Sequence, residues 1–216
     1  MDFALAEMAT QDRYKLMAST ILPRPIAWVV SQDKAGTLNA APYSFFNMVS
    51  ADPPLIVLGF LGRAGGGLKD SAANIAETQE FTISLVSEDD AAAMNFTCID
   101  APPEFDEIAA AGLEPRPSAV VAPPQIASAP VSFECRLYET IVPTGSSSSI
   151  VLGEVVHMRI DDRFVDADRL HVDGPALGLI GRMHGAGWYT RTGDLFQMSR
   201  PVFADYAAAK HQGDDS

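Results

Sequence analysis

Residues 55–80 of this chain read LIVLGFL (55–61), GRAGGG (62–67) and LKDSAANIAETQE (68–80). The first part is a continuous apolar run, which predicts a buried β-strand. The second part is a glycine-rich loop, and the third predicts a short helix over residues 70–78. Free backbone N–H groups at a helix start, together with a lysine and a hydroxyl, form a site for an anion, most often phosphate. The stretch therefore predicts an anion site that contains Lys69 and Ser71.

The loop does not match the nucleotide-binding P-loop. In that motif the second glycine is followed at once by Lys and then by Ser or Thr. Gly62 and Gly67 have the required spacing, but Leu68 displaces the lysine by one position and Asp70 follows it. A lysine displaced by one residue at a helix start points in another direction. The alternative to an anion site is an ordinary glycine-rich loop before a helix that Asp70 or Ser71 caps.

Size and charge narrow the possible functions. The chain has 216 residues, which fits one large domain, or one domain with a helical excursion, around a substantial core. Hydrophobic residues make up 47% of it, but no apolar run reaches the roughly 20 residues of a membrane span. Residues 1–15 have no apolar signal-peptide core. The net charge of −13 and the lack of a basic stripe argue against nucleic acid as a partner.

The cysteines and histidines give no sign of a metal site. Cys98 and Cys135 are isolated, with no C-x-x-C pair, which suits a reducing cytoplasm and argues against a zinc site. The sequence does not decide whether these two cysteines form a disulfide. Alternation places His157 on the strand face opposite Leu152 and Met158, which does not favour a role in metal binding. We therefore expect a cytoplasmic protein with no metal and no membrane partner.

The rest of the chain predicts many strands and a few short helices. Apolar runs and alternation predict strands at 26–30, 37–46 (broken by Pro42), 55–61, 81–85, 131–138 and 150–160. Short helices are expected at 12–19, 70–78, 89–96 and 104–111. The last two strands form a long hairpin, and a closing strand pair is expected around Gly193 and Asp194. This pattern is typical of an antiparallel barrel with helical insertions.

Several segments, taken in order, resemble those of a known family. They are LPRPIAWV (22–29), NAAPYSFFN (39–47) with DPP (52–54), KDSAANI (69–75) with ETQEF (77–81), EC (134–135), LGEVV (152–156), RMHG (182–185) with Tyr189, and RP (200–201). Together they resemble the flavin reductase-like, FMN-binding split-barrel family, in its flavoredoxin-like branch. We therefore expect one such domain over residues 12–203 and a flexible tail over 204–216.

The resemblance implies a mainly β fold, a six-stranded antiparallel Greek-key split barrel with α insertions. It implies FMN held without covalent attachment, and a homodimer with its sites at the subunit interface. Two activities are compatible with it: reduction of the flavin by NADH or NADPH, with electrons passed to a further acceptor, or electron carriage by FMN that a partner protein reduces. A non-catalytic module that binds a phosphate ligand is a third hypothesis, and it predicts no flavin.

The resemblance also assigns residues around the phosphate. Lys69 and Ser71 are expected to bind the FMN phosphate, with help from Arg63 and Asn74. Asp70 cannot bind a dianion and would cap the helix or orient Lys69. Either a serine or a threonine hydroxyl can donate to phosphate, so Ser71 fits a position where the family often has threonine.

Other assigned residues surround the flavin ring. The segment that begins at Asn39 resembles the one that lies along the ring, and Pro42, which lacks an N–H, would mark a break in the strand. Ser44 and the backbone near Ala41 and Tyr43 could then bond the ring. The remaining assignments are Arg24, near the flavin, and Arg182 and His184, in a loop that approaches it. The alternatives are a surface arginine for Arg24 and a capped turn for the loop.

No catalytic residue is assigned. Hydride transfer between nicotinamide and flavin depends on stacking and orientation more than on acid–base groups. The sequence also leaves open the electron acceptor and the choice between NADH and NADPH.

Overall fold

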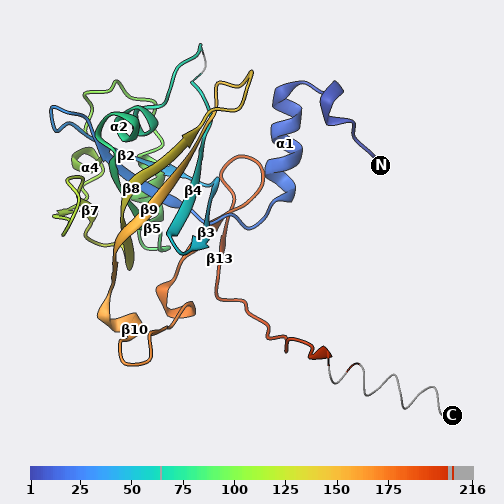
Figure 1. Cartoon of the computed structure of the whole chain (residues 1–216), viewed down its shortest axis with the longest axis vertical. Coiled ribbons are helices and arrows are strands. Elements are labelled where there is room, and N and C mark those ends of the chain that lie inside the picture. Colours follow the sequence, from blue (N-terminus) through green and yellow to red (C-terminus); the bar gives the residue numbers. More distant parts are fainter. Residues whose placement is uncertain (64, 204–205, 207–216) are drawn as a thin grey trace.

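The protein is described by a computed structural model that places residues 1–63, 65–203 and 206 (Figure 1). Its main feature is a seven-stranded antiparallel sheet with the strand order β2-β1-β5-β8-β9-β4-β3. The strands are β1 (Ala27–Gln32), β2 (Leu38–Tyr43), β3 (Phe46–Ala51), β4 (Pro54–Phe60), β5 (Glu80–Leu85), β8 (Val131–Ile141) and β9 (Ser149–Ile160). The mainly β, antiparallel fold class predicted from the sequence is confirmed.

The connection between β2 and β3 shows that this sheet is a barrel. The two strands stand at opposite ends of the strand order, yet only Ser44 and Phe45 join them. A link this short requires the sheet to curl until its two edges come close, so the barrel is split between β2 and β3. The strand expected over 37–46 is β2, which ends at Tyr43, and the seventh strand of the sheet is β3, which lies mostly in residues 47–51, where no strand was predicted.

Helices and small strand pairs complete the described chain. The helices are α1 (Thr10–Thr20), α2 (Asp70–Thr78), α3 (Ala91–Phe96) and α4 (Glu107–Ala110), with 3-10 turns η1 (Leu5–Glu7), η2 (Asp162–Phe164) and η3 (Pro175–Leu177). The small pairs are β6 (Pro115–Arg116) with β7 (Gln125–Ile126), β10 (Val165–Asp166) with β11 (His171–Val172), and β12 (Ile180–Arg182) with β13 (Tyr189–Arg191). Within the placed residues, no helix is both long and apolar enough to cross a membrane.

The closing strand pair lies earlier in the chain than predicted. It is formed by β12 and β13 and turns through residues 183–188, not around Gly193 and Asp194. Arg182 closes this turn, because its guanidinium donates to the carbonyl oxygens of Trp188 (2.8 Å) and Gly185 (2.9 Å). Gly185 and Gly187 have φ values of +58° and +80°, which side chains disfavour.

The core has two parts, one on each face of β1. Alternation along β1 sends Val29 into a cluster with Ile75 of α2, and sends Trp28 and Val30 into a cluster with Ile108 of α4. The helical segments that follow β5 therefore cover one face of the sheet, while α2 covers the other. Both faces of β1 are buried as a result.

The strand β5 is also buried on both faces, although its alternation predicted a half-buried strand. Its polar residues Thr82 and Ser84 have no exposed surface. Thr82 Oγ1 donates to the carbonyl oxygen of Pro124 at 2.6 Å, and Ser84 Oγ lies 3.2 Å from Ser132 Oγ. The loop that contains β6 and β7 thus covers this face, and polar side chains bind it there.

Glu134 of β8 is the main anchor of that loop. Its fully buried carboxylate accepts the N–H groups of residues 119 and 120 at 2.8 and 2.7 Å, and Gln125 Nε2 at 2.8 Å. His157 Nδ1 lies 3.2 Å from Glu134 Oε1. Burial alone would raise the pKa of Glu134, but these hydrogen bonds and the nearby His157 outweigh it and leave the pKa below its usual value.

Two expectations concern cysteines and metals. Cys98 and Cys135 are both free thiols, so the disulfide that the sequence left open is not formed. Among the residues that the structure describes, no group of three or more His, Cys, Asp or Glu side chains could hold a metal ion. The tail expected over 204–216 lies outside the described residues, except for Tyr206.

Candidate functional site

A cleft of about 800 Å³ lies along the outer edge of β2. Its volume falls within the roughly 300–1,000 Å³ typical of sites for small ligands and cofactors. One wall is formed by β2, the end of β4 and the start of α2, and the other by the segment after α3 and by α4. The lining residues are Asn39, Ala41, Pro42, Tyr43, Leu61, Gly62, Arg63, Lys69, Asp70, residues 97–103 and Glu107.

The first wall contains the predicted anion corner. The structure places Lys69 at the N-cap position of α2, where it makes no side-chain capping bond within the described part of the chain. The prediction that Asp70 or Ser71 caps the helix is wrong, because both residues lie inside its first turn. The N–H groups of this turn therefore remain available to an anion.

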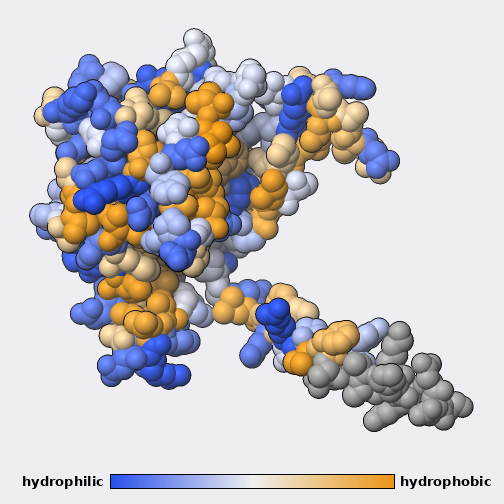
Figure 2. Space-filling view, viewed as in Figure 1, coloured by the Kyte–Doolittle hydropathy of each residue, from blue (hydrophilic) through white to orange (hydrophobic). Residues whose placement is uncertain are grey.

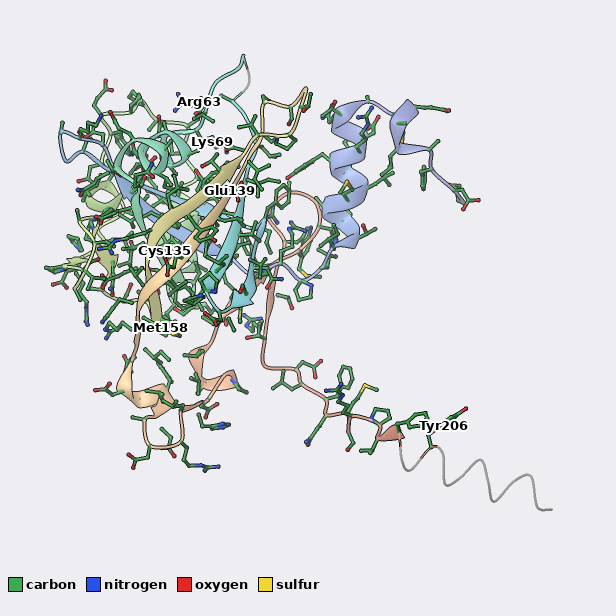
Figure 3. The ribbon with its side chains drawn as sticks, in the orientation of Figure 1. Arg63, Lys69, Cys135, Glu139, Met158 and Tyr206 are labelled. Atoms are coloured by element: carbon green, nitrogen blue, oxygen red, sulfur yellow. The ribbon has the colours of Figure 1, made fainter. Side chains whose placement is uncertain are left out.

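The glycine-rich loop brings Arg63 to the same corner (Figure 3). Gly65, Gly66 and Gly67 have φ between +91° and +96°, a backbone conformation that only glycine adopts readily. This conformation turns the loop back on itself, and the N–H of Arg63 donates to the carbonyl oxygen of Gly67 at 3.1 Å. The Arg63 guanidinium forms an ion pair with Asp70. Arg63 thus neutralises the carboxylate nearest to the corner.

Tyr43, Ser71 and Asn39 form the support under Lys69. Lys69 Nζ lies 5.8 Å from the centre of the Tyr43 ring. The Tyr43 hydroxyl donates to Ser71 Oγ at 3.0 Å, and Ser71 Oγ donates to Asn39 Oδ1 at 3.5 Å. Burial raises the pKa of Tyr43 to about 12, although its bond to Ser71 opposes this, so its hydroxyl stays a donor at neutral pH. Ser71 itself has no exposed surface, and its direct contact with phosphate stays a prediction.

Pro42 lies inside β2 and does not break it. It pairs with Trp28 in the ladder between β1 and β2. The N–H of Ala40, two residues earlier, points away from β1 and donates to Glu107 Oε2 at 3.0 Å. Alternation gives Pro42 the same outward direction, on an edge strand where no N–H is needed. The chain leaves β2 only at Ser44, so the break predicted at Pro42 is wrong.

The second wall was not predicted from the sequence. Glu107 is the first residue of α4, and its side chain is mostly buried against β2. Burial raises the pKa of Glu107, although the bond from Ala40 opposes the shift. Cys98 lies further along this wall, where burial raises its pKa and the charges of Arg182 and Lys69 oppose the change. The one local signal is Asp106, which caps α4 by accepting the N–H of Ala109.

Arg24 forms a second cluster outside the cleft lining. It is buried, so the alternative of a surface arginine is wrong. Its guanidinium donates to the carbonyl oxygens of Ala18 (2.5 Å), Ile21 (3.0 Å) and Met183 (3.1 Å), and to Ser44 Oγ (3.3 Å). Arg24 therefore holds together the end of α1, the turn between β2 and β3, and the loop after β12.

Three other predicted residues lie away from the anion corner. Arg182 stacks over the Tyr189 ring at 5.0 Å, and the exposed His184 ring lies nearly parallel to Trp188 at 6.4 Å. Asn74 donates to Ser31 Oγ of β1 at 3.3 Å. The structure thus brings Asn39, Ala41, Pro42, Tyr43, Arg63 and Lys69 together around the cleft, with Ser71 beneath them. It places Arg24, Ser44, Asn74, Arg182 and His184 outside the lining.

A curled antiparallel sheet with a cofactor-sized cleft along its edge strand defines a split barrel with a candidate ligand site. The chain belongs to the flavin reductase like domain family, which matches residues 17–175. Component B of nitrilotriacetate monooxygenase from Bacillus cereus is 33% identical, with a TM-score of 0.86, and the match covers 92% of this chain and 98% of that one. The 2-nitrobenzoate 2-nitroreductase NbaA of Pseudomonas fluorescens is also 33% identical, with a TM-score of 0.84 and coverage of 94% and 98%.

A third solved structure shares the fold. It is described as a flavin reductase with a split barrel domain, from Shewanella frigidimarina. It is 20% identical, with a TM-score of 0.78, and the match covers 93% of this chain and all of that one. The family and the split-barrel fold that the sequence predicted are therefore confirmed.

Proposed function

We propose that the cleft binds FMN, with the phosphate at the start of α2 and the ring along the edge of β2. The observation that carries this proposal is the uncapped start of α2 beside Lys69, at one end of a cleft of cofactor size. An N-terminal helix turn and a lysine are the donors that a phosphate dianion needs. The ion pair between Arg63 and Asp70 removes the repulsion that a free carboxylate would exert there.

The rest of the lining fits a flat ring system. Tyr43, Ala41 and Pro42 line the cleft next to the backbone of an edge strand. Bound FMN would supply hydride and electron transfer, and the protein would supply binding and orientation. Tyr43 keeps its proton at neutral pH, so the wall under Lys69 adds no negative charge of its own.

We propose further that the protein is an oxidoreductase that takes electrons from NADH or NADPH. Membership of the flavin reductase-like family supports this assignment. The names of the two relatives at 33% identity, a monooxygenase component and a nitroreductase, imply different electron acceptors. We therefore propose no particular electron acceptor. The two free thiols support a cytoplasmic location.

The first experiment is the visible spectrum of the purified protein, before and after it is mixed with FMN and passed over a desalting column. Retained flavin gives absorption bands at about 370 and 450 nm, the signature expected from the oxidised cofactor. A protein that retains no FMN overturns the proposal and favours a module for another phosphate ligand.

The electron donor is tested next with the FMN-loaded protein. Steady-state oxidation of NADH and NADPH, each followed at saturating concentration, is expected for one or both nucleotides. Retained FMN without turnover of either nucleotide would favour an electron carrier that a partner protein reduces.

A further inference from the structure

Glu107 is a buried carboxylic acid that lines the cleft. It is the first residue of α4 and is only 8% exposed. On the face drawn in Figure 2, by contrast, hydrophilic side chains around α2 and α4 lie open to water. One carboxylate oxygen, Oε2, accepts the N–H of Ala40 at 3.0 Å. The other oxygen, Oε1, accepts no hydrogen bond from the described residues, so it is available to a molecule bound in the cleft.

The bond to Ala40 does not explain why this position carries an acid. An N–H needs only an acceptor, which the side-chain amide of a glutamine would also supply. Burying a carboxylate without a cation costs free energy, and no cation among the described residues pairs with Glu107. A buried acid that the fold does not need, in a cleft of cofactor size, is a candidate for a functional group.

Glu134 shows how this protein holds a buried glutamate that has a structural role. Its carboxylate accepts three hydrogen bonds of 2.8 Å or shorter, which outweigh burial and leave its pKa below the usual value. For Glu107, burial raises the pKa, the single bond from Ala40 opposes the shift, and the carboxylates of Asp106 and Asp70 add to it. The first site therefore favours the ionised form and the second the protonated form.

We propose that Glu107 is the proton donor for the molecule that is reduced in this cleft. This inference rests on the proposed function, in which NADH or NADPH supplies the electrons. In that reaction the nucleotide, an oxidised acceptor and one H⁺ give the oxidised nucleotide and an acceptor with two more hydrogen atoms. The nucleotide gives up only a hydride, so the proton has a separate source. Glu107 supplies it from Oε1 to the acceptor atom that becomes negatively charged, and regains a proton from water.

This role defines a class of acceptor. The acceptors that fit are small organic molecules in which an oxygen atom takes up a proton on reduction, such as quinones. An acceptor that takes up electrons alone, such as ferricyanide, needs no acid. Glu107 belongs to the wall opposite the one that carries Lys69, so it can act on the acceptor without taking part in phosphate binding.

Other titratable groups around the cleft bear on its pH dependence. Tyr43 keeps its proton at neutral pH because burial raises its pKa to about 12, and burial also raises the pKa of the Cys98 thiol. Arg63 and Asp70 form an ion pair. The remaining charged groups are Lys69 and Asp100 in the lining and Asp106 on the same helix as the acid. Proton donation should be lost as the pH rises through the raised pKa of Glu107.

Two acceptors that differ in their need for a proton test the proposal. FMN-loaded protein is reduced with dithionite and mixed with menadione, a quinone, or with ferricyanide, and the return of the flavin band at about 450 nm is followed. Glu107→Gln keeps an acceptor for the N–H of Ala40 but has no proton to give. It should slow the reaction with menadione roughly 100-fold or more and leave the reaction with ferricyanide within about twofold. Asp106→Asn, the matched control that retains a capping side chain, should leave both rates within about twofold.

The protonation state can be measured without turnover. Infrared spectra of the FMN-loaded wild type should contain the C=O band of a protonated carboxyl group above the ordinary glutamic acid pKa of about 4.3, and Glu107→Gln should lack this band. As the pH rises, the band and the menadione rate of the wild type should decline together, while the ferricyanide rate does not follow them. The wild type alone can therefore refute the proposal, even where the variant does not fold.

Three results overturn the proposal. They are an equal effect of Glu107→Gln on both acceptors, an unchanged rate with menadione, and the absence of the protonated carboxyl band at a pH where menadione reacts rapidly. A protein that retains no FMN fails earlier, at the loading step, and that result refutes the proposed function together with this inference.

Discussion

Replacing Lys69 with alanine is the sharpest test of the anion corner. Lys69 lies at the N-cap of α2 and lines the cleft, and its ammonium group is steadied by the Tyr43 ring at 5.8 Å. A hydrogen bond to a charged group contributes about 1.5–3 kcal/mol. Lys69→Ala should therefore weaken FMN binding by about 10- to 150-fold. Arg63 cannot fully replace the lost charge, because it is paired with Asp70.

The assay compares two ligands that differ only in the phosphate. Calorimetric titration with FMN should show the loss, while titration with riboflavin should give the same dissociation constant for both proteins within about twofold. Lys34→Ala is the matched control, because Lys34 pairs with Glu77 at 2.9 Å and does not line the cleft. Equal losses for FMN and riboflavin would refute the placement of the phosphate at Lys69, since the substitution would then act on the whole cleft.

Three further predictions concern charge and packing. Asp70→Asn removes the carboxylate at the corner and releases Arg63, so calorimetry should show tighter binding of FMN and unchanged binding of riboflavin. Because hydrogen bonds hold the pKa of Glu134 below its usual value, its stabilisation is complete above the unfolded-state pKa of about 4.3 and is lost as the pH falls through the folded-state pKa. Glu134→Gln should therefore lower the urea midpoint at pH 7 and flatten its decline in acid. Gly153→Ala places a Cβ 2.5 Å from Phe81 Cζ and should lower the free energy of unfolding by roughly 1–3 kcal/mol in urea titrations.

Local signals in the sequence were sufficient to predict most strands of the barrel. The helix over 70–78 has the predicted bounds. The long hairpin of β8 and β9 is also as predicted, because apolar and polar residues alternate along β8 and the loop of residues 143–149 marks its turn. The closing strand pair was misplaced, because its turn depends on the side chain of Arg182 as well as on Gly185 and Gly187, and nothing in the sequence indicated the bonds that Arg182 makes. The burial of β5 was missed for a similar reason, since the covering loop is held by Glu134, which lies beyond it in the chain.

The candidate site also has one part that the sequence predicted and one part that it did not. The residues that line the first wall follow each other along β2 and around the glycine-rich loop, so short motifs could identify Asn39, Tyr43 and Lys69. The second wall depends on the bond between Glu107 and Ala40, which are 67 positions apart. Nothing near Glu107 indicates that its carboxylate accepts the N–H of Ala40 on the edge strand. Distant contacts of this kind are set by the packing of α4 on β2, not by local sequence.

The two walls of the cleft come from different parts of the fold, which suggests that they have different functions. The first wall belongs to the barrel itself, since β2 and α2 both pack into the core and a shift of either would disturb it. The second wall comes from the segment between β5 and β8, where residues 97–103 lie outside regular structure. Such segments tolerate substitutions that a barrel strand does not. We therefore expect the barrel wall to hold the cofactor and the inserted wall to select the acceptor. Substitutions of Ile99 or Asp100 should then change which acceptor is reduced while FMN affinity stays within about twofold, and a parallel loss of both would contradict this division.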